Sequence, residues 1–331
     1  MKYYQLHTQT KGSDISIDQE EDIISHSEKF RNILSFSKRV ATSSSTILIQ
    51  GESGTGKGVL ANYIHNLSHR KNESFLTINC AAIPEELLES ELFGYVKGAF
   101  TGANPSGKMG LLETANNGTV FLDEIGDISL SLQAKLLPAI QDKEFIPVGG
   151  NKKRKVNIRI IAATNRDLSK LVESGEFRED LYYRLHVIDI TIPPLRERKE
   201  DIAPLTHHLL QKFNQEYETN KIISDECLNV LSDYSWPGNI RQLESLIERL
   251  VITSDTIIDV ADLPETFHHN NQLNSQFKEP KTMDEAIDTT RKHMIRKSFK
   301  KYKSTRKVVE DLQVSQTTAS RLIRKYCSDF R

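Results

Sequence analysis

The sequence is poor in cysteine and tryptophan and lacks any long apolar run. Only three cysteines, Cys80, Cys227 and Cys327, occur in 331 residues, and they lie far apart. Their odd number and wide spacing argue against a disulfide framework and indicate buried thiols in a reducing compartment. No stretch approaches the ~18 apolar residues of a membrane span, and the polar N-terminus has no signal-peptide core. We therefore expect a cytoplasmic protein that is neither secreted nor membrane-spanning.

The net charge of −1 conceals an uneven distribution of charge. Residues 281–331 contain 14 Lys/Arg and 6 Asp/Glu, a balance of +8, so the other 280 residues carry −9. A small basic segment attached to an acidic body indicates a nucleic-acid-binding module. A solvated helix surface has the same composition, so charge alone leaves both interpretations open.

Short β-branched runs alternate with helical segments from residue 22 to residue 193. This alternation predicts an α/β fold with a doubly wound parallel sheet covered by helices on both faces. The pattern then becomes helical only, and an Asn/Gln/Ser-rich linker leads to a last helical block. The expected strands are residues 46–50, 75–80, 119–123, 158–164 and 187–192. The expected divisions are an N-terminal tail (1–21), the sheet domain (22–193), a helical domain (194–265), a linker (266–283) and a small all-α domain (284–331).

A glycine-rich loop, GESGTGKG, follows the first expected strand and precedes a helix. Glycines allow the backbone to wrap closely around phosphates and to point its N–H groups at the anion, and Lys57 would reach the β- and γ-phosphates. The strict pattern requires Ser or Thr at position 58, where this chain has Gly58. The predicted nucleotide-binding residues of the loop are Gly51, Glu52, Ser53, Gly54, Thr55, Gly56, Lys57 and Gly58.

Two adjacent acids stand at the end of the expected strand 119–123. Asp123 is placed to hold Mg²⁺, and Glu124 is placed to polarise the attacking water. An acidic pair at a strand end is also common in simple turns, so the pair is a weak signal alone. Together with the glycine-rich loop, in this order and in an α/β alternation, it predicts a nucleoside triphosphatase.

Several further motifs occur in a fixed order along the chain. They are GESGTGK (51–57), GAFTGA (98–103), FLDEIGD (121–127), FREDLYYRL (177–185) and WPGNIRQLE (236–244). Together they resemble the motifs of the bacterial enhancer-binding proteins, which activate sigma-54 RNA polymerase, and the resemblance covers residues 22–263 and the C-terminal helices. It implies an AAA+ ATPase that uses ATP and Mg²⁺, has an α-helical lid after the sheet domain, and is active as a ring, usually a hexamer.

The resemblance also implies roles for single residues. Asn79 resembles the switch residue that holds the catalytic glutamate, and Asn165 resembles the sensor at a strand end. Arg241 resembles the lid sensor of nucleotide state and would contact the nucleotide. Arg178 and Arg184 resemble arginine fingers that reach the γ-phosphate bound by a neighbouring subunit, where a positioned charge can contribute ~10³–10⁵ in rate. Without the resemblance, a surface salt bridge would be the preferred interpretation of these two arginines.

The GAFTGA segment surrounds one aromatic side chain with small residues, which suits an exposed contact loop better than a core. In the family this loop engages sigma-54, with Phe100 and Thr101 at its tip. Residues 144–159 predict a hairpin that turns at Gly149 and Gly150, and they resemble a second insertion that moves the first. The basic run 152–155 is either solvated or close to DNA. The predicted sigma-54 contacts are Gly98, Ala99, Phe100, Thr101, Gly102 and Ala103.

The chain departs from the family pattern in two ways. Members usually have Glu at the position of Gly58, so metal affinity or turnover can differ here. Members commonly carry a sensory domain before the ATPase, and 22 residues are too few to fold into one. Either regulation comes from elsewhere, or the sequence is a piece of a longer protein.

Near the C-terminus, two short helices and a turn are expected. Ser304 would cap the first helix (305–311), a turn follows at 312–314, and Ser315 would cap the second. This pattern favours a helix–turn–helix that reads one half-site, so we expect dimers on palindromic double-stranded enhancer DNA; a charged helical hairpin for oligomerisation is the alternative. The expected inner residues are Val308, Val309, Leu312, Val314, Ala319, Leu322 and Ile323. The expected DNA-binding residues are Ser315, Gln316, Thr317, Thr318, Ser320, Arg321, Arg324 and Lys325.

Together these features predict a sigma-54-dependent transcriptional activator. ATP hydrolysis in a ring would drive the Phe100–Thr101 loop against sigma-54 RNA polymerase holoenzyme and convert a closed promoter complex into an open one. One rival is a DNA-binding regulator that only senses nucleotide, and another is a remodelling AAA+ protein such as an unfoldase. The GAFTGA loop argues against the first rival, and the basic C-terminal helices argue against the second.

Overall fold

A computed structural model describes residues 6–7, 23–100, 104–267, 283–302 and 304–327. The predicted sigma-54 contacts Thr101, Gly102 and Ala103 lie outside the described residues, as does most of the predicted linker. The chain divides into two compact units, residues 1–262 and 263–331, which are considered separately. No helix in the described ranges is long and apolar enough to span a membrane.

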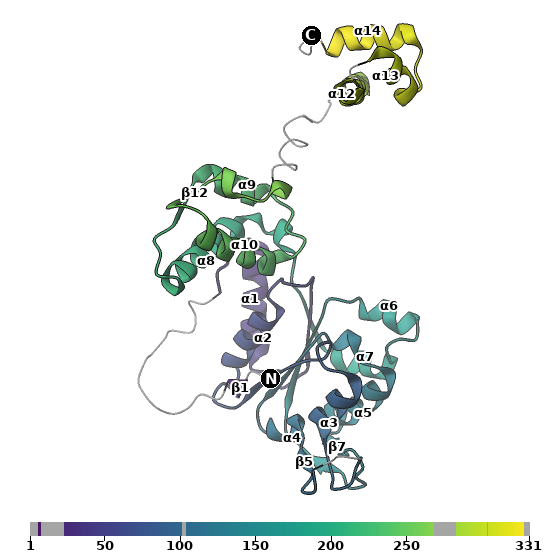
Figure 1. The fold of residues 1–331 in the computed structure, drawn as a ribbon. Helices are drawn as coiled ribbons and strands as arrows, with labels where there is room; N and C mark the ends of the chain where they lie inside the picture. Colours follow the sequence, from purple (N-terminus) through teal and green to yellow (C-terminus); the bar gives the residue numbers. More distant parts are fainter. Residues whose placement is uncertain (1–5, 8–22, 101–103, 268–282, 303, 328–331) are drawn as a thin grey trace. The chain divides into compact units, whose positions relative to one another are not determined.

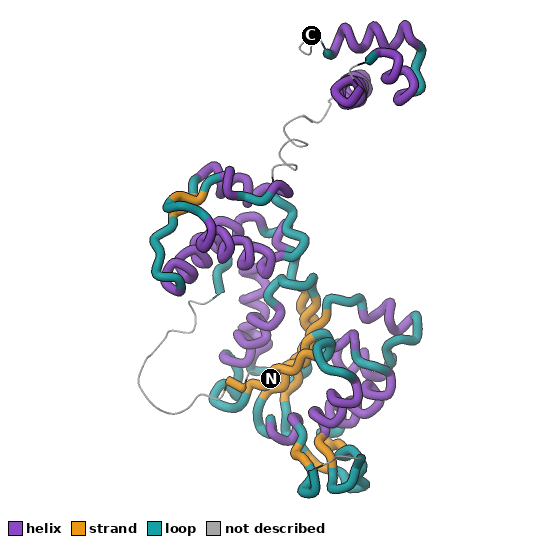
Figure 2. The backbone as a smooth tube through the Cα atoms, viewed as in Figure 1, coloured by secondary structure: helices purple, strands orange, loops and turns teal. Residues whose placement is uncertain are grey.

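A six-stranded sheet forms the centre of the first unit (Figures 1 and 2), in the order β1-β3-β6-β9-β2-β10. Five strands are parallel and confirm the predicted strands, each end to within one residue. They are β2 (Ile47–Gln50), β3 (Phe75–Asn79), β6 (Thr119–Asp123), β9 (Arg159–Thr164) and β10 (Ile188–Thr191). The sixth, β1 (Leu6–His7), pairs antiparallel with β3 at the sheet edge. This strand lies in the predicted tail. It was not predicted, because a run of two residues is too short to indicate a strand.

Alternate residues of each parallel strand pack on opposite faces of the sheet, as its period of two requires. On one face, Ile47 and Ile49 pack with α1 (Glu28–Ala41) and α2 (Lys57–Asn66). On the other face, Leu48 belongs to a cluster with α3 (Glu85–Phe93), α5 (Leu130–Gln141) and α7 (Glu179–Leu185). The doubly wound α/β prediction is therefore confirmed. Two shorter helices, α4 (Leu111–Thr114) and α6 (Leu168–Glu173), complete this part.

A small helical lid follows the last strand. Its helices are α8 (Ile202–Glu216), α9 (Asp225–Asp233) and α10 (Asn239–Thr253), as the sequence predicts. The expectation of helices only is wrong in one detail, because β11 (Ile222–Ile223) and β12 (Ile257–Ile258) form a short parallel pair. Trp236 lies fully buried before α10 and donates its indole N–H to the Leu231 carbonyl oxygen at 2.8 Å.

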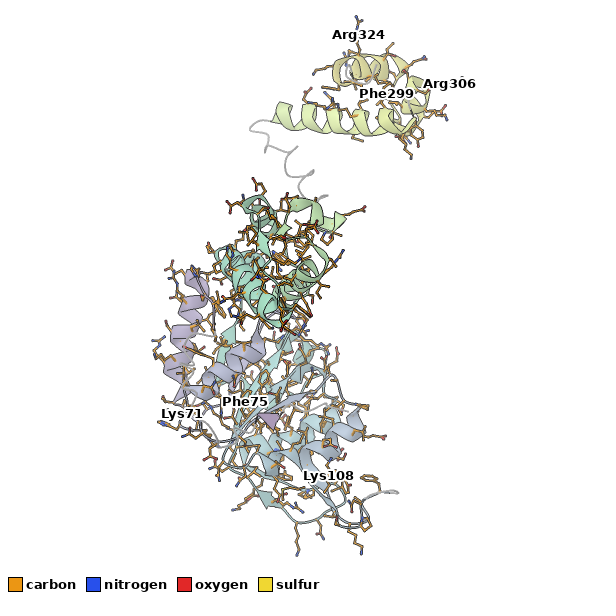
Figure 3. All side chains as sticks on the ribbon, turned by 60° about the vertical axis from the view of Figure 1, so that its left-hand side comes forward. Lys71, Phe75, Lys108, Phe299, Arg306 and Arg324 are labelled. Atoms are coloured by element: carbon orange, nitrogen blue, oxygen red, sulfur yellow. The ribbon has the colours of Figure 1, made fainter. Side chains whose placement is uncertain are left out.

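From residue 283 onward, the described residues of the second unit form three helices, α12 (Met283–Tyr302), α13 (Thr305–Leu312) and α14 (Gln316–Tyr326). All seven predicted inner residues belong to one apolar cluster, which α12 completes with Ile295 and Phe299. In Figure 3, Phe299 lies among these helices, whereas Arg306 and Arg324 extend from their outer surface. The helix–turn–helix prediction is confirmed. Elsewhere, all three cysteines are buried as predicted, and burial raises the pKa of Cys80 to about 12.

Candidate functional site

The glycine-rich loop joins β2 to α2. Gly54 and Gly56 have φ angles of +79° and +101°, in the left-handed region that other residues rarely adopt. A Cβ atom at Gly54 would also collide with the Gly238 carbonyl oxygen. Lys57, only 6% exposed, donates from its ammonium to the Gly51 carbonyl oxygen at 3.1 Å. The loop thus has the tight, glycine-dependent conformation that phosphate binding requires.

The carboxyl ends of neighbouring strands bring three more predicted residues to Lys57. Asp123 ends β6, and Glu124 follows in a left-handed conformation (φ +54°) of the kind that concentrates at functional sites. One Glu124 carboxylate oxygen accepts from the Lys57 ammonium at 3.3 Å. The other accepts from the backbone N–H of Asn165, just after β9, at 3.0 Å. The carboxyl ends of the parallel strands therefore bring a buried cation and two acids together.

The pKa of Asp123 is raised by burial and by the negative charge of Glu124, with the charges of Lys57 and Arg241 acting in the opposite direction. Two carboxylates that repel each other in this way are stabilised by a hard cation, and Mg²⁺ prefers such oxygen ligands. On this ground the residues present fit a magnesium ion beside Asp123.

Asn79 ends β3 directly beside Asp123 in the pairing of β3 with β6. Its side-chain oxygen accepts from the backbone N–H groups of Ala81 and Ala82, at 3.0 and 3.1 Å. In the described part of the chain, Glu124 is hydrogen-bonded to Lys57 and Asn165 and not to Asn79. The predicted switch residue is therefore close to the site, but the switch contact is not formed in this conformation.

The start of α10 brings the lid onto the glycine-rich loop. The Arg241 guanidinium donates to the Ser53 hydroxyl oxygen at 2.7 Å. The backbone N–H of Ile240 donates to the Gly54 carbonyl oxygen at 2.9 Å. Arg241, the predicted lid sensor, thus lies at the loop.

A cavity of about 460 Å³ lies between the loop and the lid, a size typical of small-ligand sites. Lys57, Asp123, Glu124 and Arg241 line it together with apolar side chains, a combination that suits a nucleotide. Other wall residues were missed, because an amphipathic helix pattern does not distinguish a cavity wall from a core contact. The residues that the sequence analysis did not predict are Ile23, Ile24, Phe30, Val59, Leu60, Arg198, Leu205, His208, Leu209, Lys212, Ile240 and Glu244.

The two predicted arginine fingers lie at the start and in the last turn of α7, and neither lines this cavity. Arg178 precedes the helix and forms a bidentate ion pair with Asp180, the shorter contact being 2.7 Å. Arg184 lies in the last turn, and both arginines are exposed. Arg178 therefore forms the local salt bridge that the residues alone favour.

The two predicted insertions contact each other. The first is the hairpin of β4 (Gly94–Tyr95) and β5 (Lys108–Met109), and the second is the hairpin of β7 (Glu144–Phe145) and β8 (Arg154–Lys155). Figure 3 labels Lys108 in the first of these. Val148 bonds through its backbone to Gly94 and Val96, at 2.9 and 3.1 Å. Phe100 is 48% exposed, with its ring centroid 5.0 Å from that of Tyr95.

A turn closes the second hairpin at Pro147–Gly150, where the Gly150 N–H donates to the Pro147 carbonyl oxygen at 2.9 Å. This confirms the predicted turn position. At Gly149, φ is +73°, and a Cβ atom would lie 2.7 Å from the Ala99 Cβ. Gly149 of the second insertion therefore packs closely against Ala99 of the GAFTGA loop.

The predicted DNA-contacting face lies on α14. Ser315 caps this helix, accepting from the Thr318 N–H at 3.2 Å, whereas Ser304 makes no such side-chain cap at α13, contrary to the prediction. Lys325 is ion-paired to Asp288 of α12 at 2.8 Å. The other predicted contacts that are exposed are Ser315, Gln316, Thr317, Ser320, Arg321 and Arg324, with Thr318 half-buried.

Three family models match the chain in succession. They are a sigma-54 interaction domain over residues 23–191, an AAA+ ATPase lid domain over 196–280, and a helix–turn–helix domain over 280–327. The fold and the cavity thus define an AAA+ protein with a DNA-binding module. Because the sigma-54 interaction domain matches more than half of the sequence, the chain belongs to the family of sigma-54-dependent transcriptional regulators.

Relatives agree with this assignment. The putative uric acid sigma-54-dependent transcriptional regulator UacR of Escherichia coli (strain K12) is 42% identical over 339 residues, which cover 98% of this chain and 57% of UacR. The chain thus spans little more than half the length of that relative. A crystal structure of NtrX from Brucella abortus with ADP superposes with a TM-score of 0.71 and 29% identity, over 93% of this chain and 70% of NtrX. A crystal structure of NtrX with ATP superposes with a TM-score of 0.69 and 30% identity, over 92% of this chain and 69% of NtrX.

Proposed function

We propose that this chain is an ATPase that, as a ring, drives promoter opening by sigma-54 RNA polymerase holoenzyme. The observation that carries the proposal is the 3.3 Å contact between Lys57 and Glu124, inside a cavity shared by the glycine-rich loop and the lid. NtrX, which has the same fold, binds ADP and ATP, and this supports nucleotide binding here.

Each group in the cavity would have one task. Lys57 would hold the β- and γ-phosphates, and Asp123 would hold Mg²⁺, which neutralises negative charge on the phosphates when bound. Glu124 would orient the attacking water and accept its proton. Glu124 must leave Lys57 before it can do so, because the carboxylate oxygen that accepts from the Lys57 ammonium is not free to accept from water.

The remaining predicted residues would report nucleotide state. Asn79 would exchange its backbone partners for Glu124 when the water must be restrained, and Asn165 and Arg241 would sense the γ-phosphate from the sheet and the lid. Arg178 and Arg184 would act on the nucleotide of a neighbouring subunit, for which Arg178 must release Asp180. Hydrolysis would then require ring assembly, and we propose a hexamer as the active form.

The two insertions and the C-terminal helices would connect this ATPase to its targets. The exposed Phe100 would contact sigma-54, and the second insertion would move the first through Val148 and Gly149. The second unit would bind double-stranded enhancer DNA as a dimer, with α14 in the major groove.

The decisive experiment is open-complex formation by the purified protein with sigma-54 polymerase on a known sigma-54 promoter. A high protein concentration removes the need for an enhancer. We expect melting with ATP and none with a non-hydrolysable analogue or with the Glu124→Ala variant, which should bind ATP without turnover. If ATP is hydrolysed and the promoter stays closed, the activator proposal fails in favour of a nucleotide-sensing regulator.

A further inference from the structure

The lid holds the glycine-rich loop from its outer side. A phosphate-binding loop points its N–H groups at the anion, so its carbonyl oxygens point elsewhere and need other donors. Three of these oxygens take their donors from the lid and the short segment that leads into it, whereas the Gly51 and Glu52 carbonyl oxygens accept from Lys57 and Thr55 within the loop. Ser53 accepts from the Asn239 side-chain amide (3.0 Å), Gly54 from the Ile240 N–H (2.9 Å) and Thr55 from the Arg198 guanidinium (2.7 Å).

Glu52 places an acidic side chain in this anion-binding loop. Its carboxylate accepts two hydrogen bonds from the Arg196 guanidinium, at 2.8 and 2.6 Å, and one from the Asn239 amide at 3.1 Å. The hydrogen bond from Arg196 holds the pKa of Glu52 below its usual value, so the acid is charged and neutralised together with its partner. Without Arg196, this negative charge would repel the phosphates of a nucleotide.

Asn239 fixes the geometry of this contact. It is fully buried and left-handed (φ +51°) at the start of α10. Its side-chain oxygen accepts from the backbone N–H of Leu195 at 2.7 Å, while its amide nitrogen donates to Glu52 and Ser53. One side chain therefore aligns the residue before Arg196 with the loop that Arg196 must reach.

We propose that Glu52 and Arg196 form a clamp, aligned by Asn239, that fixes the glycine-rich loop to the lid and cancels the acidic charge of the loop. Arg196 is a positioning residue, because it contacts Glu52 and not the nucleotide. The inference rests on the proposed ATPase function, since it assigns how the loop is prepared for a triphosphate. A clamp that works through charge makes two demands. Loss of Arg196 must weaken the binding of a nucleotide more strongly, the more negative charge its phosphates carry. Removal of the Glu52 charge must restore the affinity that is lost.

The test compares the dissociation constants of ATP, ADP and AMP, by calorimetry, for the wild type, Arg196→Ala, Glu52→Gln and the double variant. We expect Arg196→Ala to bind ATP roughly 10-fold more weakly, with a smaller loss for ADP and the smallest for AMP. Glu52→Gln retains hydrogen-bond acceptance but leaves the charge of Arg196 uncancelled beside the loop, so we expect ATP to bind more tightly than to the wild type. The double variant should recover most of the affinity that Arg196→Ala loses.

The matched control is Lys199→Ala, which removes a positive charge three residues away. The Lys199 ammonium pairs with Asp233 at 3.5 Å and not with the loop, so nucleotide affinity should not change. Arg196→Lys retains the charge but not the bidentate geometry, so its ATP affinity should lie between that of the wild type and that of the alanine variant. If Arg196→Ala binds ATP as the wild type does, or if the double variant stays as weak as Arg196→Ala, the clamp is refuted while the ATPase proposal stands. If the wild type binds no ATP, the proposed function fails and the clamp fails with it.

Discussion

The ammonium of Lys57 and the carboxylate of Glu124 lie 3.3 Å apart, and their side chains are only 6% and 15% exposed. In such a shielded position each charge depends on the other for compensation. The same two groups are proposed to bind phosphate and to activate water. A nucleotide must therefore compete with Glu124 for Lys57, which couples the arrival of phosphate to the release of the acid.

Lys57→Ala should abolish ATP binding and also destabilise the protein. The variant leaves Glu124 beside Asp123 without the buried cation, so we expect the free energy of unfolding to fall by about 2 kcal/mol. ATP titration and urea unfolding measure the two effects. Lys170→Ala is the control, because the exposed Lys170–Asp167 pair should contribute less than about 0.5 kcal/mol. An ATP affinity like that of the wild type would remove Lys57 from the site.

Gly58 occupies the second position of α2 and has an ordinary helical backbone. A Cβ atom there would meet the Phe121 ring edge at 3.7 Å, which is normal contact. Gly58→Ala and Gly58→Ser should therefore both fold, and the alanine variant should gain about 0.5 kcal/mol in unfolding free energy, because glycine is the poorer helix former.

Only the serine variant restores the hydroxyl that the strict loop pattern places near the metal. We expect Gly58→Ser, and not Gly58→Ala, to lower the Mg²⁺ concentration that supports half-maximal ATPase activity. Steady-state hydrolysis over a Mg²⁺ series checks this. Equal Mg²⁺ requirements in both variants would show that the hydroxyl plays no part in this protein.

Gly149 and Gly175 offer a matched pair of left-handed glycines, with φ angles of +73° and +74°. A Cβ atom would lie 2.7 Å from the Ala99 Cβ at Gly149, whereas nothing lies within 4 Å at Gly175. Alanine at either position should cost about 1 kcal/mol in backbone strain. Gly149→Ala should in addition displace the GAFTGA loop, so promoter opening should be lost while ATP hydrolysis continues. Full promoter opening by Gly149→Ala would show that the contact between the insertions does not transmit movement.

How much of this structure the sequence predicts depends on the length of each strand and on the sequence separation of the residues in contact. The parallel strands were predictable because each contains an apolar, β-branched run of four or more residues, whereas β1, β11 and β12 have only two residues each. Asp123 and Asn165 were predictable because the first ends a strand and the second directly follows one, and Lys57 was predictable because it closes the glycine-rich loop. Asn239 lies within the WPGNIRQLE motif, but the contacts of Arg196 and Asn239 with Glu52 span 144 and 187 residues and depend on the position of the lid. No local pattern contains that information.

Arg324 and Lys325 are adjacent basic residues on α14 with different surroundings. Lys325 is ion-paired to Asp288 at 2.8 Å, whereas Arg324 is exposed and has no ion pair among the described residues. A phosphate contact releases about one counterion from DNA, so its loss should reduce the slope of log K against log salt by ~0.9.

We therefore expect Arg324→Ala to weaken DNA binding and to reduce the salt slope by about one contact, and Lys325→Ala to change the slope less. Fluorescence anisotropy with duplex DNA over a salt series measures both, and thermal unfolding checks that the second unit remains folded. Lys325 must break its ion pair with Asp288 before it can contact a phosphate, and this lowers the net free energy that its phosphate contact contributes to DNA binding. A larger slope change for Lys325→Ala than for Arg324→Ala would mean that DNA binding rearranges α12 and α14, and that the face described here is not the one that meets the duplex.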